Sequence, residues 1–322
     1  MKVVLAKPRG FCAGVERAIR CVERALELYG RPVYVLHDIV HNATVVEGLR
    51  GRGAVFVGSL DAVPRGAHLL FSAHGVGPAQ WEAARGRGLD IIDATCPLVG
   101  KVHREAKRLA GEGYAIILIG EKGHDEVVGT AGWASGHIQV VFTEQDVASV
   151  QVADAARVAY LTQTTLSVDE CSRVISALER RFPGIQGPPS EDICYATQNR
   201  QRAVNELAPE ADLVLVVGDA QSANSKRLAE ICRNKGKASH LIRSAALIED
   251  GWLEGVDTVL VTSGASAPEF LVQGVIERLQ SMASCEVEER VVVEEDVHFS
   301  LPDAIRQRER VSVPPKDEIR KY

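Results

Sequence analysis

The 322-residue sequence lacks the features of a membrane protein and of a nucleic-acid binder. No apolar run approaches the roughly 18 residues that a membrane span requires. The N-terminus begins with a predicted strand over residues 2–6 and shows no signal peptide with a small-residue cleavage site. A formal net charge of −6 gives no general basic field for nucleic acid. We therefore expect a cytoplasmic protein that binds neither membrane nor nucleic acid.

Motifs of the common nucleotide and zinc sites are also missing. There is no Gly-x-x-x-x-Gly-Lys-[Ser/Thr] sequence, and no convincing Gly-x-Gly-x-x-Gly follows the first strand, so nucleotide chemistry has no support. Paired Cys-x-x-Cys knuckles, which are common in structural zinc sites, are absent. The seven cysteines are odd in number and widely spaced, which fits a reducing compartment better than a disulfide framework.

Three of these cysteines share one local pattern. Each of Cys12, Cys96 and Cys194 ends an apolar run and precedes a helix rich in charged residues. Polar loops then recur at similar distances behind each cysteine. The first loop, 28 or 29 residues on, carries His41, His124 or Ser222, and the second, 62 to 72 residues on, carries His74, Thr164 or Ser266. This threefold pattern indicates one site built from three parts of the chain.

Strands alternate with helices along the chain, which predicts an α/β fold with mainly parallel sheets. Length and spacing together predict three similar α/β modules around a pseudo-threefold axis. The expected modules cover residues 13–95, 96–193 and 194–285. The N-terminal strand and Cys12, in residues 1–12, stand at the start of the first, and residues 286–322 hold one more strand and a charged, irregular tail. Because parallel sheets bind ligands beyond the carboxyl ends of their strands, the site should lie where the modules meet.

Three thiolates from separate segments suit a metal centre. The Cys96-Pro97 step occurs in some iron–sulfur ligand runs. A [4Fe–4S] cluster held by three cysteines would keep one iron open as a Lewis acid and electron conduit. Three unrelated buried cysteines remain the alternative.

The polar loops suit an anionic ligand. His41, His74 and His124 could donate to a phosphate or bind a metal. Hydroxyl and amide groups stand where helices begin, where N-capping is their simpler role, and they could also form a diphosphate pocket. These residues are Thr164, Ser222, Asn224 and Ser266. Glu126 is the carboxyl group best placed to act as an acid, because a closed pocket beside an anion raises its pKa.

Several of these motifs resemble the LytB family, the 4-hydroxy-3-methylbut-2-enyl diphosphate reductases. The likeness runs from about residue 2 to residue 300. It rests on PRGFCAGV (8–15), SAHG (72–75), DATCP (93–97), TQTTLS (162–167), DICYAT (192–197), NRQ (199–201) and GASAP (264–268).

The resemblance implies an oxidoreductase for the last step of the non-mevalonate isoprenoid pathway. Its substrate, (E)-4-hydroxy-3-methylbut-2-enyl diphosphate, would lose its hydroxyl as water and give isopentenyl and dimethylallyl diphosphates. Cys12, Cys96 and Cys194 would hold one [4Fe–4S] cluster with one open iron, at the centre of a trefoil fold. Glu126 would be the proton donor, and reduced ferredoxin or flavodoxin the electron donor. The substrate would lie among His41, His74, His124, Thr164, Ser222, Asn224 and Ser266.

Two positions depart from the family pattern. Ala223 stands where the family usually has the second serine of Ser-Ser-Asn, so one hydroxyl is missing. Asp125 replaces the proline of His-Pro-Glu, which adds negative charge near an anionic substrate and Glu126. Two other functions remain open: a three-thiolate zinc phosphoester hydrolase, and a non-catalytic paralogue that binds a phosphorylated metabolite.

Overall fold

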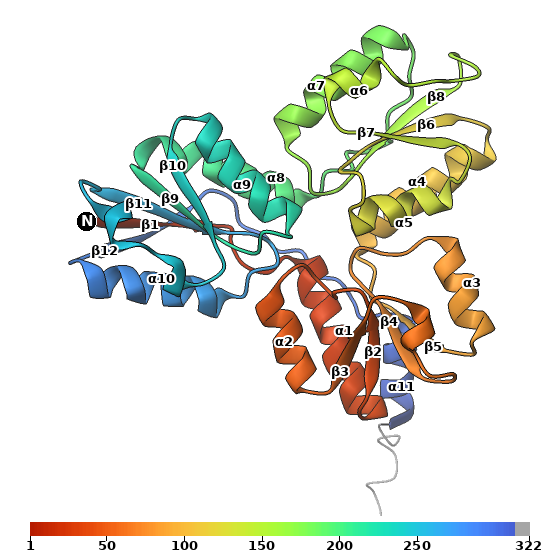
Figure 1. Cartoon of the computed structure of the whole chain (residues 1–322), viewed down its shortest axis with the longest axis horizontal. Helices are drawn as coiled ribbons and strands as arrows, with labels where there is room; N and C mark the ends of the chain where they lie inside the picture. The colour runs from red at the N-terminus through yellow and green to blue at the C-terminus, as the bar shows by residue number, and fades with distance from the viewer. Residues whose placement is uncertain (313–322) are drawn as a thin grey trace, which may run out of the picture.

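The computed structural model describes residues 1–312, which form three parallel sheets arranged around a common centre (Figure 1). The α/β fold class with three similar modules is confirmed. Within the described residues, no helix is long and apolar enough to span a bilayer. The predicted tail at residues 313–322 lies outside the described part of the chain.

The first sheet has four strands in the order β3-β2-β4-β5. Its strands are short apolar runs whose buried side chains, such as Leu69, Leu70 and Phe71, face helices on both sides. The strands are β2 (Val33–Leu36), β3 (Ala54–Val57), β4 (His68–Phe71) and β5 (Asp90–Asp93). The helices are α1 (Ala13–Tyr29), α2 (Ala43–Gly51) and α3 (Pro78–Gly86), with a 3-10 turn at Leu60–Ala62.

The second sheet has three strands in the order β7-β6-β8. Its central strand, β6 (Ala115–Ile119), is buried on both faces, which explains its unbroken apolar sequence. The neighbouring strands are β7 (Ile138–Val141) and β8 (Val158–Thr162). The helices are α4 (Pro97–Gly111), α5 (Asp125–Trp133), α6 (Glu144–Val147) and α7 (Val168–Arg181).

The third sheet has five strands in the order β10-β9-β11-β1-β12. The strands are β1 (Lys2–Lys7), β9 (Leu213–Val217), β10 (Ala238–Ile242), β11 (Thr258–Ser263) and β12 (Glu286–Val291). The helices are α8 (Tyr195–Leu207), α9 (Ala223–Asn234) and α10 (Glu269–Met282), with 3-10 turns at Ala208–Glu210, Ala245–Leu247 and Asp250–Leu253.

The N-terminal strand corrects one expectation from the sequence. We placed residues 1–12 at the start of the first module, but β1 pairs with β11 and β12 in the third sheet. In Figure 1 the red strand β1 lies among the blue strands. Val3 and Leu5 pack on one face of that sheet and Val4 and Ala6 on the other, so β1 needs a sheet covered on both sides.

The chain end corrects a second expectation. Instead of an irregular tail, Asp303–Ser312 form helix α11, which packs against α1 of the first module (Figure 1). Ile305 is fully buried in that module's core, and Arg24 Nε donates to Glu309 at 2.8 Å. The sequence of α11 is largely charged and few of its side chains are buried, so it lacks the apolar periodicity from which a helix is predicted. The other module boundaries stay a prediction.

Candidate active site

Each of the three predicted cysteines caps a helix. Cys12, Cys96 and Cys194 are the N-cap residues of α1, α4 and α8. The Sγ atoms of Cys12 and Cys96 accept no capping hydrogen bond, while Cys194 Sγ accepts one from the Thr197 N–H at 3.4 Å. A helix N-terminus carries partial positive charge and favours thiolate, so the three ends form a good setting for negatively charged sulfur.

Backbone hydrogen bonds bind each cysteine to a polar loop. The Cys96 N–H donates to Ala73 O at 2.9 Å, and the Cys194 N–H donates to Thr164 O at 3.0 Å. The Cys12 N–H donates to Ala265 O at 3.2 Å. These acceptors belong to the loops of His74, Thr164 and Ser266, the second polar loop of each predicted unit. The three cysteines, which share one pattern in the sequence, therefore also make the same kind of backbone contact, each with the second polar loop of another unit.

The three thiols face one cavity together with all the other predicted site residues. Its lining includes Cys12, Cys96, Cys194, His41, His74, His124, Glu126, Thr164, Ser222, Asn224 and Ser266. The apolar wall of this cavity was not predicted from the sequence; it is formed by Val15, Val40, Leu98 and Val99. These residues carry no chemical signal in a sequence, because apolar side chains in core and pocket look alike.

The cysteines fit a group that takes three soft ligands. Gly14 lies between two of them, since a Cβ on it would come within 2.7 Å of Cys96 Sγ and 3.9 Å of Cys12 Sγ. Burial raises the pKa of Cys96 to about 12 and that of Cys194 to about 11, whereas metal coordination deprotonates a thiol outright. No fourth cysteine lines the described cavity, so three thiolates would leave one position of a cluster open.

The three predicted histidines form one cluster. The rings of His41 and His74 stack with centroids 4.0 Å apart, and His124 stands edge-on to both, at 5.2 and 5.7 Å. Burial lowers the pKa of His124 to about 4 and holds the pKa of His74 well below its usual range. The imidazoles are thus neutral donors and acceptors at neutral pH.

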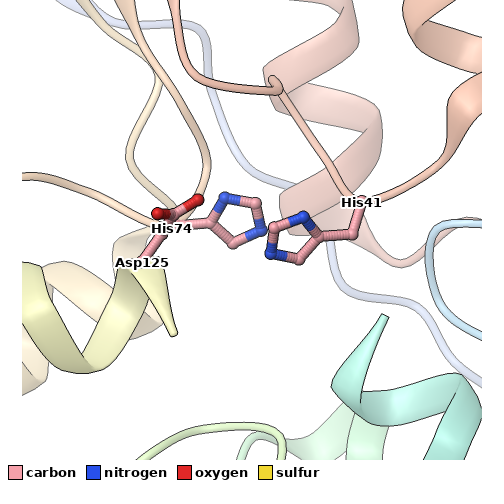
Figure 2. Close-up of side chains that lie close together, drawn as sticks. All are labelled: His41, His74 and Asp125. Carbon is pink, nitrogen blue, oxygen red and sulfur yellow. The ribbon is translucent and has the colours of Figure 1, made fainter. Parts of the chain in front are cut away.

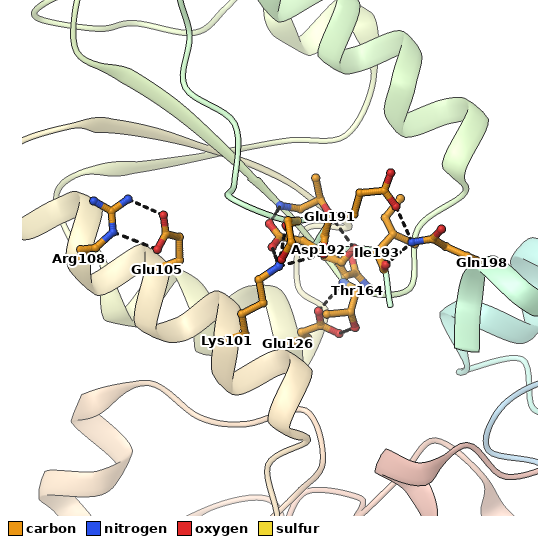
Figure 3. Close-up of polar contacts among 12 residues, drawn as sticks. Lys101, Glu105, Arg108, Glu126, Thr164, Glu191, Asp192, Ile193 and Gln198 are labelled. Atoms are coloured by element: carbon orange, nitrogen blue, oxygen red, sulfur yellow. Dashed lines mark hydrogen bonds and ion pairs between the residues drawn. The ribbon is translucent and has the colours of Figure 1, made fainter. Parts of the chain in front are cut away.

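Glu126 is a buried carboxyl group, with 3% of the residue exposed. It accepts hydrogen bonds from the Thr164 N–H at 2.6 Å and the Thr164 hydroxyl at 3.0 Å (Figure 3). The pKa of Glu126 is raised to about 7, mainly by burial; the Thr164 hydrogen bonds oppose this rise and the charge of Asp192 adds to it. Glu126 therefore holds a proton near neutral pH, as an acid catalyst requires.

The raised pKa of Glu126 predicts that the stability of the protein depends on pH. A buried carboxyl with a raised pKa stabilises the fold while protonated, and this stability is lost as pH rises from about 4.5 through about 7. The loss amounts to at most about 3 kcal/mol. We expect Glu126→Gln to gain melting temperature relative to the parent as pH rises from 5 to 8.5, measured by calorimetry. Glu82→Gln, at an exposed carboxylate, serves as control, and parallel profiles for Glu126→Gln and the parent would contradict the prediction.

An ion pair behind the site supports this arrangement (Figure 3). Lys101 Nζ lies 3.1 Å from Asp192 Oδ1 and donates to the carbonyls of Ser190 and Glu191 at 2.7 and 2.9 Å. Asp192 also accepts from the Thr162 N–H at 3.1 Å. The pair ties α4, whose N-cap is Cys96, to the loop that carries Cys194. Neither residue was singled out from sequence, although Asp192 belongs to the DICYAT motif.

The hydroxyl and amide residues divide into two kinds. Ser222 caps α9, accepting from the Ser225 N–H at 3.3 Å and hydroxyl at 3.0 Å, so its N-capping role is real. Ser266 Oγ donates to His41 O at 3.0 Å. Asn224 differs, because its amide nitrogen and oxygen are both buried with no hydrogen-bond partner in the described chain. A buried amide without partners is costly, which indicates that a ligand completes it.

Comparison with known proteins decides the family. The family model described as "LytB protein" matches residues 3–280. The chain belongs to the LytB family. A relative from Bordetella pertussis, named 4-hydroxy-3-methylbut-2-enyl diphosphate reductase, is 55% identical over 95% of this chain and 94% of its own. One of the same name from Mycolicibacterium paratuberculosis is 56% identical over 95% of this chain and 92% of its own.

Solved structures agree with the LytB assignment. The reductase from Plasmodium falciparum has a TM-score of 0.92 and 38% identity, over 96% of this chain and 98% of that one. A second structure is described as (E)-4-hydroxy-3-methyl-but-2-enyl diphosphate reductase, the terminal enzyme of the non-mevalonate pathway. It has a TM-score of 0.63 and 33% identity, over 87% of this chain and 100% of that one.

Asp125, one departure from the LytB pattern, acts on the histidines. Its carboxylate and one ring nitrogen each of His41 and His74 all lie within 4.8 Å of one another (Figure 2). The charge of Asp125 opposes the fall that burial causes in the pKa of His41 and His124. The charge that raises the pKa of Glu126 comes from Asp192. The rings of His41 and His74 are stacked, 22° from parallel.

Proposed function

We propose that this chain is a 4-hydroxy-3-methylbut-2-enyl diphosphate reductase of the non-mevalonate pathway. Its reaction removes the allylic hydroxyl of the (E)-substrate as water and gives isopentenyl and dimethylallyl diphosphates. The observation that carries the proposal is a single cavity in which the thiols of three N-cap cysteines, a buried carboxyl group and a polar cluster meet. The names of the LytB relatives support the same activity.

The proposed cofactor is one [4Fe–4S] cluster held by Cys12, Cys96 and Cys194, with one iron open. When bound, it supplies electrons and a Lewis-acid position. Reduced ferredoxin or flavodoxin is the proposed electron donor. Because such a centre needs reducing conditions, we place the protein in the cytoplasm.

The diphosphate would be held by neutral donors and a helix end. The described lining of the cavity contains no lysine or arginine. His41, His124 and Asn224 supply hydrogen-bonding groups, and the N-terminus of α9, capped by Ser222, adds its partial positive charge. With Ser266 beside His41, these groups would position the diphosphate, while the apolar wall would receive the five-carbon chain and exclude water.

Glu126 would deliver the proton that the leaving hydroxyl needs. The allylic C–O bond breaks, the oxygen leaves as water, and a second proton reaches carbon, with two electrons entering in all. The Thr164 N–H and hydroxyl fix the orientation of the Glu126 carboxyl group. His74 and Thr164 are proposed to contact the substrate between the thiols and the diphosphate groups.

Conversion under anaerobic conditions tests the proposal. Holoprotein supplied with dithionite-reduced methyl viologen should turn the allylic diphosphate into both products, identified by mass spectrometry. Mössbauer spectra with and without substrate should show one distinct iron changing its ligation. A colourless protein with stoichiometric zinc that cleaves phosphoesters would favour the hydrolase. An intact cluster with ligand binding and no conversion would favour the non-catalytic paralogue.

Ala223→Ser should improve substrate binding. Ala223 is buried at the first position of α9 and lines the cavity, so a hydroxyl there can reach the diphosphate. One added neutral hydrogen bond contributes about 0.5–1.5 kcal/mol, or about 2- to 12-fold in affinity. The measurement is the substrate Kd by calorimetry on oxidised holoprotein. Ala220→Ser, in the exposed turn before α9, is the matched control, and equal Kd values for all three proteins would refute the expectation.

A further inference from the structure

A second cavity, with a volume of about 670 Å³, lies next to one cluster cysteine. Cys96 lines both this cavity and the central one. The walls come mainly from α3, α4 and the last residue of α5, which meet where the first and second modules join (Figure 1). We call this cavity the Cys96 cleft. Through this cavity, the thiol of Cys96, a proposed cluster ligand, can be approached from the protein surface.

The Cys96 cleft is positively charged in a chain whose formal net charge is −6. Arg85 on α3 and Arg104 and Lys107 on α4 line it, are exposed, and form no ion pair within the described residues. Of the two carboxylates in its lining, Glu82 is exposed, while Asp93 accepts a hydrogen bond from the Thr95 N–H at 3.0 Å. Unpaired exposed cations around a cavity attract an acidic partner and speed its approach.

Two tryptophans stiffen the same surface. The guanidinium of Arg85 lies 5.3 Å from the ring centre of Trp81, and Lys107 Nζ lies 5.6 Å from that of Trp133. Trp133 is further fixed by its indole N–H, which donates to Val76 O at 3.0 Å. Tryptophan and arginine are the residues on which protein interfaces most often depend. The Cys96 cleft thus has rigid apolar anchors beside its charges.

The other approach to the cysteines has the opposite charge. A cavity near Cys12 and Cys194 is lined by Phe11, Ala13 and Tyr195, the neighbours of those cysteines. Its four glutamates are Glu16, Glu269, Glu289 and Glu295, against the cations Lys7 and Arg9. Both cations are already paired, Lys7 with Glu294 and Arg9 with Glu269 and Glu289. Glu295 is likewise paired, with Arg200, so the described lining of this cavity offers an acidic protein no unpaired lysine or arginine, which makes the Cys96 cleft the favourable approach.

We propose that the Cys96 cleft is the docking site of the electron donor, a small acidic iron–sulfur or flavin protein. The inference rests on the proposed reductase function. Each docked donor is oxidised by one electron, so two successive dockings supply the two electrons. With two protons, these break the allylic C–O bond and release water and the diphosphate alkene. Redox partners of this kind form small interfaces steered by charge, which the cleft suits.

The test is the holoenzyme variant Arg104→Glu/Lys107→Glu with a recombinant acidic [2Fe–2S] ferredoxin as probe. At low ionic strength the KM for reduced ferredoxin should rise by about tenfold or more, and added salt should affect the variant less than the parent. Turnover with reduced methyl viologen, a small dye that needs no docking, should stay within about twofold. Independently of turnover, the Kd for oxidised ferredoxin measured by calorimetry should rise in parallel.

Arg233→Glu/Lys235→Glu is the matched control, with the same charge change on exposed residues at the far end of α9. Its ferredoxin KM and Kd should equal those of the parent. An unchanged Kd in the Arg104/Lys107 variant, or an equal loss in the control, would overturn the docking site. If the parent reduces no substrate even with methyl viologen, the reductase function itself fails, and the ferredoxin Kd still decides the docking site. Lys107→Gln gives a milder version should the double variant melt early.

Discussion

Glu126→Gln is expected to lower kcat by about 10²- to 10⁴-fold, the range that a positioned general acid contributes. Glutamine keeps the size of the side chain, its oxygen can still accept from the Thr164 N–H, and its NH2 group can donate to the Thr164 hydroxyl, but it has no acidic proton to deliver. The cluster content and the substrate Kd should therefore stay close to those of the parent. The measurement is single-turnover reduction under anaerobic conditions, with iron analysis on the same sample.

The pH profile adds a second readout for Glu126. Because its pKa is raised to about 7, the protonated form is the major one below that pH and declines above it. The kcat of the parent should fall on the alkaline side of about pH 7, and this limb should be missing in Glu126→Gln. A variant with full activity, or with an unchanged alkaline limb, would remove Glu126 from the role of proton donor.

Replacing one of the proposed cluster cysteines should have an even larger effect. Cys194→Ala removes one of three thiolates, and two are too few to retain the proposed cluster. We expect loss of the visible absorption and of bound iron, and activity at the background of the assay. Cys171→Ala is the matched control, since Cys171 is buried in α7 and packs in the core of the second module away from the cavity. Equal iron content in the two variants would rule out Cys194 as a ligand.

The parts of the site that could be predicted follow from the regular geometry of α/β units. Parallel strands bring their carboxyl ends to one edge, so polar loops at repeated distances from Cys12, Cys96 and Cys194 had to converge. The same reasoning gave His41, His124 and Ser222 as one equivalent set. Function beyond a three-thiolate polar pocket came from the resemblance, because spacing alone names no substrate.

What the sequence could not give depends on contacts between distant residues. The strand β1 is apolar on both faces and would suit any covered sheet, so its partners β11 and β12 were not predictable. The Lys101–Asp192 ion pair joins two segments that no local pattern connects. Likewise, the sequence shows only that Asp125 stands next to Glu126 in the chain. The structure was needed to show that the Asp125 carboxylate lies beside His41 and His74.

The position of β1 has a consequence for how the protein is made. The ribosome synthesises this strand before the other described elements, whereas its neighbours in the sheet, β11 and β12, follow every strand of the first and second sheets. Such pairing across nearly the whole chain is slow and cannot begin during most of translation. The first and second sheets can form early, while the loop of Cys12, held to Ala265, stays open until the end. We therefore expect the proposed cluster to be inserted only after β11 and β12 have been synthesised and have paired with β1.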